Sequence, residues 1–356
     1  MNIIKRHLTK ETSTNILLLM TALLGMFAFF DLLQELESIG KGSYGVGKIL
    51  LFVLLSAPGH IYEIVPLAVL IGTMYTLAQF ARNSELIILR VSGMSILDIG
   101  IALLRIGLVF ALLTFIVGEL ITPLSEKTAQ RMRVKAIESV VAQDFRSGLW
   151  VKDGKSFVNV EQVLPDAELV NVHIYQFDEN FQMTAINTAK SARFNGDNWD
   201  LKDLTATRLE KVKVESKTLP QAKWKSLIRP ELMNVLLVVP EKMSAWNLYS
   251  YISHLSKNKQ KTARYEIALW AKIIYPIASV VMIMLALPFG FLQQRSGGVA
   301  GKILAGIMLG ILYQVLNKVF LHLGLLNDWS AFTSAVMPTF LFLLTSLFML
   351  VWVESQ

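Results

Sequence analysis

Long apolar stretches recur along this chain, and they constrain its fold more than any other feature. Six of them lie near residues 14–36, 57–81, 96–120, 266–292, 298–323 and 331–353. A helix of about twenty residues crosses the ~30 Å hydrocarbon core of a bilayer. Only 17% of the 356 residues are charged, against about 25% in ordinary soluble domains. The sequence predicts an integral membrane protein with six transmembrane helices, the first too long for a removable signal peptide.

Residues 122–265, between the third and fourth apolar stretches, have a different character. Short runs of alternating polar and apolar residues surround turn signals at Asp153-Gly154, Asp178-Glu179-Asn180 and Asn195-Gly196. Such dipeptides between alternating runs favour β-hairpins, and many short strands at close spacing are typical of a β-sandwich or jelly roll. We therefore predict a membrane α-helical bundle with an inserted all-β, jelly-roll-like domain.

The polar segments 126–141 and 245–260 at the two ends of the insert have helical character, and we expect them to continue the third and fourth spans beyond the bilayer. The predicted division is residues 1–121 for the first three spans, 122–265 for the β-domain with its flanking helices, and 266–356 for the last three spans.

Basic residues in the short loops predict the orientation. Lys and Arg are enriched in short cytoplasmic loops, whereas long domains cross the membrane largely regardless of charge. With a cytoplasmic N-terminus, the inner segments hold seven basic residues and the outer loops hold two. The seven are Lys5, Arg6, Lys10, Arg82, Arg90, Arg295 and Lys302, and the two are Lys41 and Lys48. Both termini are therefore expected in the cytoplasm, with the β-domain outside the inner membrane.

The stretch GSYGVGKI at residues 42–49 resembles a phosphate-binding loop but lacks its chemistry. Such a loop needs a preceding strand and a hydroxyl after the lysine to hold Mg²⁺. Here an apolar run precedes it and Ile49 follows the lysine. We interpret the stretch as a glycine-rich turn, so that any ATP and Mg²⁺ bind on a partner chain.

Catalytic and metal-binding patterns are absent from the sequence. It has no cysteine, and its five histidines form no i, i+4 pair, so thiol chemistry and a zinc site are not expected. The central thirds of the six stretches are almost uncharged, which argues against an ion-coupled transporter. We expect no cofactor, metal, catalytic site or nucleic-acid partner for this chain.

The loop between the second and third stretches is expected to form a short helix over residues 83–92. Asn83 or Ser84 can cap it, Glu85 lies in its first turn, and Ser92-Gly93 can end it. Glu85 could pair with an arginine of a soluble partner or simply complement the helix dipole.

Basic residues near the outer ends of the spans are candidates for binding an anionic lipid headgroup. Lys318 lies about a turn and a half from the outer end of the fifth stretch, and Arg131, Arg133 and Lys135 lie just beyond the third. The alternative is that these side chains extend to the interface or form an ordinary solvated helix face.

Several stretches together resemble one family of membrane proteins. They are GKGSYG, RNSELIILRVSGMS, GELITPLSE, GLWVKDGKSFVNVEQV and ARYEIALWAKIIYPIASVVMIMLALPFG. In this order, and with three spans on each side of a β-domain, they resemble the LptF/LptG permeases of lipopolysaccharide export, the LptG branch more than the LptF branch. The resemblance covers essentially the whole chain.

The resemblance implies a set of partners. Permeases of this family pair as an LptF–LptG heterodimer, bind two copies of the ATPase LptB, and are joined by the single-span protein LptC. The complex takes lipopolysaccharide from the outer leaflet of the inner membrane and passes it through jelly-roll domains to a periplasmic bridge of the LptA type. This chain would then be a permease subunit and not an enzyme.

The resemblance also implies sites. The short helix matches the family's coupling helix, with Arg82, Ser84, Glu85, Leu86 and Arg90 as the residues that contact the ATPase. The family's lysines at the outer end of the first span correspond here to Asp31, Glu37 and Ser38. One of its two arginines corresponds to Arg133, and the other to Gln130. Our hypothesis is that Lys41, Arg133 and Lys318 meet the headgroup charge, with local help from Arg131 and Lys135.

Acyl chains are expected in a cavity lined by the first, second and fifth spans, with Phe27, Phe30, Leu67 and Phe320 as candidates. The alternative for each of these side chains is ordinary packing between helices. Two other functions remain open for the chain: a membrane-anchored receptor whose β-domain binds an envelope ligand, and an envelope assembly scaffold without transport activity.

Overall fold

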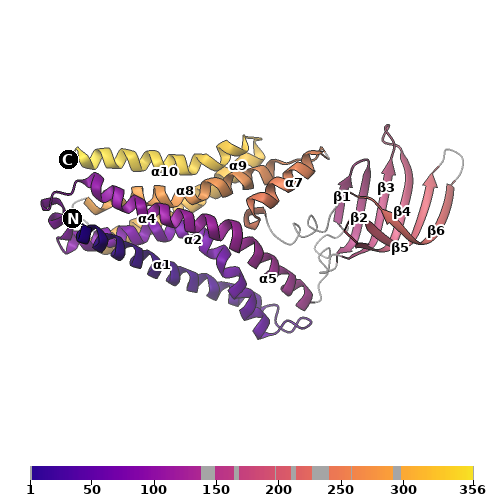
Figure 1. The fold of residues 1–356 in the computed structure, drawn as a ribbon, viewed down its shortest axis with the longest axis horizontal. Coiled ribbons are helices and arrows are strands. Elements are labelled where there is room, and N and C mark those ends of the chain that lie inside the picture. Colours follow the sequence, from indigo (N-terminus) through magenta and orange to yellow (C-terminus); the bar gives the residue numbers. More distant parts are fainter. Residues whose placement is uncertain are drawn as a thin grey trace.

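The computed structural model describes residues 2–137, 149–163, 168–196, 198–209, 214–226, 240–257, 259–291 and 298–355. A bundle of helices and a β-sheet lie end to end, and both chain termini lie at the end of the bundle away from the sheet (Figure 1). Arg295, one of the residues used to predict orientation, lies outside the described residues.

The predicted six apolar helices are confirmed. Each is long and apolar enough to cross a membrane. They are α1 (Asn2–Leu36), α2 (Val46–Arg82), α4 (Ile96–Ile116), α8 (Ala263–Phe291), α9 (Gly298–Leu326) and α10 (Ala331–Glu354). A π-helical turn, η1 (Val117–Ile121), joins α4 to α5 (Thr122–Ile137), so the helix of the third span continues into the polar segment that begins at residue 126.

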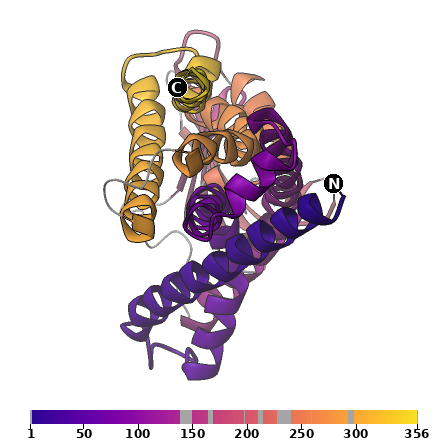
Figure 2. The same cartoon turned by 90° about the vertical axis from the view of Figure 1, so that its left-hand side faces the viewer.

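α2 forms the centre of the bundle. In the most apolar part of α2, 78% of the residues are buried, against 6% in α1 and 17% in α9. α9 approaches α2 through Gly306 and Gly310, where an added Cβ would lie 2.8 Å from the sulfur of Met74 and 2.0 Å from Cδ1 of Leu67. Small residues of this kind allow membrane helices to pack closely. The outer surfaces of α1, α9 and α10 carry exposed apolar side chains, as contact with lipid requires. Figure 2 shows α1 and α9 at the edge of the bundle.

Two helices begin earlier than the predicted spans. α1 begins at Asn2, where a polar segment continues the helix, and α2 begins at Val46, where the apolar run of residues 49–55 is helical as well. Leu8 in the polar start of α1 is fully buried, and Lys5 lies 3.6 Å from Asp98 at the start of α4. Gly42 adopts a φ of 55°, and Lys48 Nζ donates to Ser43 Oγ at 2.8 Å. Residues 40–45 thus form a glycine-rich turn, which covers only the first part of the predicted stretch 42–49, because α2 already begins at Val46.

The segment that precedes the fourth span does not continue it, which corrects our expectation for residues 245–260. It forms a separate helix, α7 (Ala245–Lys257), which follows a 3₁₀ turn, η3 (Pro240–Lys242). Lys259 adopts a left-handed φ of 53° between α7 and α8. The chain therefore turns back here instead of extending one long helix.

The insert contains a six-stranded antiparallel sheet in which the strands follow the chain order. The strands are β1 (Leu149–Asp153), β2 (Ser156–Val163), β3 (Leu169–Phe177), β4 (Met183–Phe194), β5 (Trp199–Leu209) and β6 (Val214–Trp224). The three predicted turns join β1 to β2, β3 to β4 and β4 to β5, with Gly154 and Gly196 at positive φ. The inserted β-domain is confirmed, and its described strands form one twisted sheet instead of the two facing sheets of a complete jelly roll (Figure 1).

One face of this sheet carries its own apolar core. Side chains from β1 to β5 form a cluster in which Val158, Leu169 and Trp199 are fully buried. Phe194 and Trp224 pack on Trp199, with ring centroids 5.3 and 6.4 Å from it. The alternation of polar and apolar residues along the strands produces this arrangement, because successive side chains point to opposite faces.

Candidate functional site

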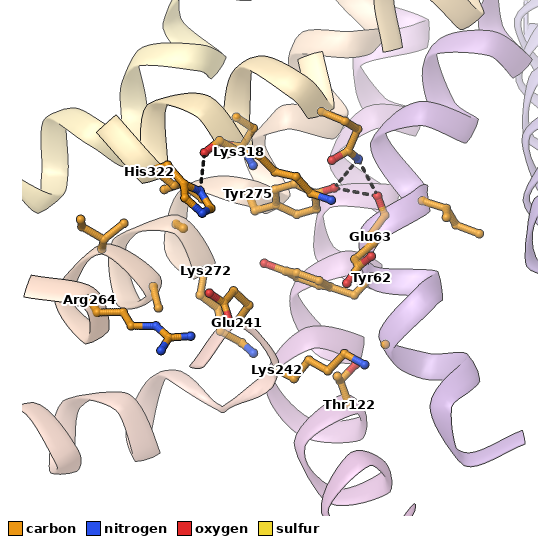
Figure 3. Close-up of a pocket in the computed structure, with 18 of the residues that line it drawn as sticks. Tyr62, Glu63, Thr122, Glu241, Lys242, Arg264, Lys272, Tyr275, Lys318 and His322 are labelled. Carbon is orange, nitrogen blue, oxygen red and sulfur yellow. Dashed lines mark hydrogen bonds between the residues drawn. The ribbon is translucent and has the colours of Figure 1, made fainter. Parts of the chain in front are cut away.

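A cavity of about 620 Å³ opens between α2, α8 and α9, near the end of the bundle that carries the β-domain (Figure 3). Its walls combine apolar and aromatic side chains with a set of basic ones and two acidic ones, Glu63 and Glu241. The aromatic and apolar members include Phe27, Tyr62, Leu67, Tyr275, Leu321 and Leu325, and the basic members are Lys242, Arg264, Lys272, Lys318 and His322. Apolar walls with a few converging polar groups are typical of ligand sites.

A hydrogen-bonded group holds the three helices together in the cavity wall. The backbone carbonyl of Glu63 accepts hydrogen bonds from Tyr275 Oη at 2.7 Å and from Gln314 Nε2 at 3.0 Å. Gln314 also donates to Tyr275 Oη at 3.0 Å. Pro66 lies in α2 one turn further on, and a proline within a helix loosens the backbone bonds of the preceding turn. Side chains of α8 and α9 thus bind the backbone of α2 in the turn that precedes this proline.

The basic side chains of the cavity differ in how they are neutralised. Lys242 lies 3.3 Å from Glu126, and the buried ammonium of Lys272 donates to the Met243 carbonyl and lies 5.5 Å from the centre of the Tyr62 ring. Arg264 and Lys318 form no ion pair within the described residues, and both are exposed. These two cations are therefore available to an anionic ligand.

The predicted lipid residues divide among several places. Phe27, Leu67 and Lys318 line the cavity together. Phe30 is 57% exposed on α1, and Phe320 lies against Trp329 with ring centroids 6.3 Å apart; neither lines the cavity. Sequence reasoning missed Arg264 and Lys242, although Arg264 belongs to a visibly basic run at residues 257–264.

Arg133 lies in a second cluster, where α5 meets the end of α1. Its Nε donates to the buried carboxylate of Glu35 at 2.9 Å, and Tyr44 Oη donates to the same oxygen at 3.0 Å. The guanidinium also lies 5.8 Å from the centre of the Phe52 ring. Burial of Tyr44, together with its bond to Glu35, raises the pKa of its phenol above the ordinary value. The charge of Arg133 is therefore already neutralised within the chain.

Three of the other predicted headgroup residues, Lys41, Arg131 and Lys135, lie near this second cluster. The backbone N–H of Ser43 donates to the Ala136 carbonyl at 2.7 Å, which joins the turn carrying Lys41 to the part of α5 carrying Lys135. Lys41 and Lys135 are exposed, and Arg131 is partly exposed one turn back on α5. Lys318 belongs to the cavity, so the structure does not group it with Lys41 and Arg133 as our hypothesis did.

Asp31, another acidic side chain near the end of α1, forms a contact between α1 and α2. Asp31 Oδ2 is 2.6 Å from His60 Nε2, and the His60 ring stacks on Phe27 with centroids 5.1 Å apart. Asp31 occupies one of the positions where the resemblance implied a lysine. Here the side chain is part of a contact between two helices, which the sequence alone could not indicate.

The short helix is present as α3 (Glu85–Val91), at the end of the bundle that carries the N-terminus. Our capping expectation is wrong in detail: Ser84 precedes the helix with a φ of 61° and no side-chain cap, while Asn83 Nδ2 donates to Glu85 Oε1 at 3.3 Å. Glu85 also lies 3.4 Å from His7 Nε2. Glu85 is thus held by neighbours within the chain.

The two faces of α3 differ sharply. Leu86 and Leu89 are buried against the bundle, whereas Ile87, Ile88 and Val91 are 62%, 59% and 83% exposed. Of the residues predicted to contact an ATPase, Arg82, Ser84 and Arg90 are exposed, and Leu86 instead anchors the helix. Sequence reasoning missed the three exposed apolar residues, which form a patch that a partner could cover.

Comparison with known proteins identifies the family. The chain is 29% identical to the lipopolysaccharide export system permease protein LptG of Haemophilus influenzae over 357 residues, covering 100% of this chain and 99% of the relative. It is 28% identical to the protein of the same name from Escherichia coli K12, covering 98% of both chains. The family model described as lipopolysaccharide export system permease LptF/LptG matches residues 6–352. This six-helix membrane protein with an inserted β-domain therefore belongs to the LptF/LptG family of lipopolysaccharide export system permeases.

Proposed function

We propose that this chain is the LptG-type permease subunit of an ABC-type exporter, which takes lipopolysaccharide from the outer leaflet of the inner membrane and passes it to a periplasmic bridge protein of the LptA type. Its partners would be an LptF-type permease, an LptC-type single-span protein and a dimeric LptB-type ATPase that binds ATP and Mg²⁺. The termini would lie in the cytoplasm and the β-domain in the periplasm.

The observation that carries this proposal is the cavity near the β-domain end of the bundle. Lipopolysaccharide has apolar acyl chains and phosphates on one molecule. The cavity combines apolar walls such as Leu67 with Arg264 and Lys318, two cations that form no ion pair among the described residues. Each CH₂ transferred from an apolar surface to water costs about 0.8 kcal/mol. A multi-chain lipid therefore needs an apolar path from the bilayer to the buried face of the β-sheet.

The energy for that movement would enter through α3. Its exposed patch of Ile87, Ile88 and Val91 lies at the opposite end of the bundle from the sheet. Binding of a soluble ATPase there would bury this patch, with Glu85 and Arg90 at its polar border. Closure of the ATPase dimer would then displace α3 and with it the directly attached α2, which forms one wall of the cavity.

The test of the proposal is co-purification of the chain with the ATPase and the LptF-type partner in mild detergent. We expect a stable complex whose ATPase activity rises when lipopolysaccharide is added. Ile88→Asp is expected to lower recovery of the ATPase at least about tenfold, since it places a charge in an apolar contact, and Glu85→Ala is expected to lower it less. Phe181→Asp, the same kind of change on an exposed side chain of the β-domain, serves as control.

Each alternative function gives a different result. A receptor or an assembly scaffold would fold and reach the membrane but recover no ATPase, and lipopolysaccharide would not change ATP hydrolysis. Equal ATPase recovery with Ile88→Asp and Phe181→Asp would reject α3 as the contact.

The cations of the cavity give a separate prediction. In the double variant Arg264→Ala/Lys318→Ala, photocrosslinking of lipopolysaccharide to position 67 is expected to fall at least about tenfold, because each hydrogen bond to a charged group contributes about 1.5 to 3 kcal/mol. Lys223→Ala/Lys225→Ala, which removes two exposed charges from the β-domain, is the matched control. Unchanged crosslinking in the cavity variant would contradict a headgroup role for this pair.

A further inference from the structure

α7 lies beside the first turns of a membrane-spanning helix. Leu248 is fully buried and forms a small core with Met243 and with Ala268 of α8, against which Tyr265 and Leu269 also pack. Only residues 258–262 separate α7 from α8, so α7 runs back along its neighbour (Figure 1). Ala268 is five residues into α8, or about 7 to 8 Å along its axis. The first turn of α7, which carries Leu248, is therefore level with the outer part of a membrane span.

The N-terminal end of α7 is deeper still. Just before it, the Met243 carbonyl accepts a hydrogen bond from Lys272, which is nine residues into α8 and hence about 13 Å from the start of that span. The carboxylate of Glu119, in the π-helical turn of the third span, accepts hydrogen bonds from the backbone N–H of Ala245 at 2.8 Å and of Trp246 at 3.5 Å.

These contacts supply hydrogen-bond acceptors for the first N–H groups of α7, which lie away from water. The first N–H groups of a helix have no partner within the helix, and in a bilayer they must be satisfied by the protein. Glu119 satisfies two of them from a different span.

The face of α7 turned away from the bundle changes character along its length. Trp246 and Tyr249, one turn apart, are 74% and 61% exposed, with ring centroids 6.4 Å apart. Ser250, Ser253 and Lys257 follow on the same face at helical spacing. The exposed face therefore begins with two large aromatic rings at its deep end and finishes with a positive charge at its shallow end.

Positive charge continues into the turn that joins α7 to α8. Lys257, Lys259 and Lys261 are exposed, and none of the three has an ion-pair partner among the residues that the structure describes. Trp and Tyr concentrate where membrane meets water, and clustered lysines beside a span attract the phosphates of anionic lipids. Aromatic rings at the deep end and lysines at the shallow end match the order of layers in a lipid leaflet.

We propose that α7 is an interfacial helix, which lies in the surface of the lipid bilayer at the end of the bundle that carries the β-domain. Trp246 and Tyr249 enter the boundary between acyl chains and headgroups, and Lys257, Lys259 and Lys261 contact the phosphates of anionic lipids. This inference requires only that the six helices span a membrane, and it does not rest on the export function proposed above.

The experiment uses the fact that the chain has no cysteine. Single cysteines replace Trp246, Tyr249 or Lys257, carry an environment-sensitive fluorophore, and are placed with the full chain in nanodiscs of phosphatidylcholine and phosphatidylglycerol. Quenching by doxyl-labelled lipid is compared with quenching by aqueous iodide. Phe348→Cys, on the exposed surface of α10, is the lipid control, and Ser216→Cys, on β6, is the water control.

We expect the labels at 246 and 249 to be quenched by doxyl-lipid at least threefold more than the label at 216, and to resist iodide. The label at 257 should be more accessible to iodide, and doxyl-phosphatidylglycerol should quench it more than doxyl-phosphatidylcholine. The double change Lys259→Gln/Lys261→Gln should reduce that difference between lipids.

Positions 246 and 249 are both labelled because, if one cysteine variant fails to fold, the label at the other position still measures the surroundings of this face of α7. Iodide quenching at both positions equal to that at 216 would overturn the proposal. Protection of both positions from iodide and from doxyl-lipid would overturn it too, because protein and not lipid would then cover this face.

Discussion

Replacing Trp199 with alanine is expected to destabilise the β-domain by about 3 to 5 kcal/mol, the range for removing a large aromatic side chain from a packed core. Trp199 has no exposed surface and packs between Phe194 and Trp224. Because it begins β5, the cavity left behind would loosen the pairing of β4 with β5 and of β5 with β6. Hydrogen exchange of the β4 and β5 amides in the full chain measures the effect.

Trp150→Ala provides the matched control. This tryptophan is 53% exposed on β1 and stacks on Tyr175 with ring centroids 5.5 Å apart. Its removal leaves little cavity and loses one aromatic pair, for which about 1 kcal/mol is expected. Exchange in β4 and β5 that is equally fast in the two variants would show that Trp199 does not hold the core together.

Arg133→Ala is expected to destabilise the contact between α1 and α5 by about 2 to 3 kcal/mol. The change leaves the carboxylate of Glu35, whose side chain is 8% exposed, without its cation. Breaking a buried pair costs about 3 to 5 kcal/mol, and the expected value is smaller because 35% of the Arg133 side chain is exposed to solvent. The lost stability is measured by thermal unfolding in detergent, with proteolytic cleavage of the turn at residues 38–45 as the signal for unfolding.

A double-mutant cycle separates this structural role from lipid binding. With Glu35→Gln added, the Arg133→Ala variant should regain most of the lost stability, since the buried charge is gone. If Arg133 bound the headgroup instead, lipopolysaccharide crosslinking would stay low in the double variant even as stability returned. A coupling energy near zero between the two positions would contradict the ion pair as a stabilising contact.

The six helices could be predicted because membrane spans have a simple signal. A long apolar stretch can be recognised as a span without knowledge of its neighbours. Two of the three predicted turns of the sheet were visible for a similar reason, because Asp-Gly and Asn-Gly have strong local preferences. The polar start of α1 was missed, since it is helical through tertiary contacts such as the burial of Leu8. The separate helix α7 was missed because its polarity resembles a continued span.

The candidate site was less predictable than the fold. Lys318 and Leu67 were found from their places along spans, but the sequence could not show that Arg133 meets Glu35 across 98 residues. Nor could it show that Arg264 joins Lys318 at one cavity, since these residues belong to different helices. Charged residues near the end of a membrane span look alike in a sequence. Only the three-dimensional contacts show which of them form ion pairs and which can bind a ligand.

The position of α2 has a mechanical consequence. Its 37 residues extend about 55 Å, from the joint with α3 at one end to the turn docked on α5 at the other. Between them it carries Glu63, whose carbonyl holds α8 and α9, and Pro66, where a helix bends most readily. Displacement of α3, as proposed above, would therefore be carried along one continuous helix, past the wall of the cavity, to the turn that docks on α5.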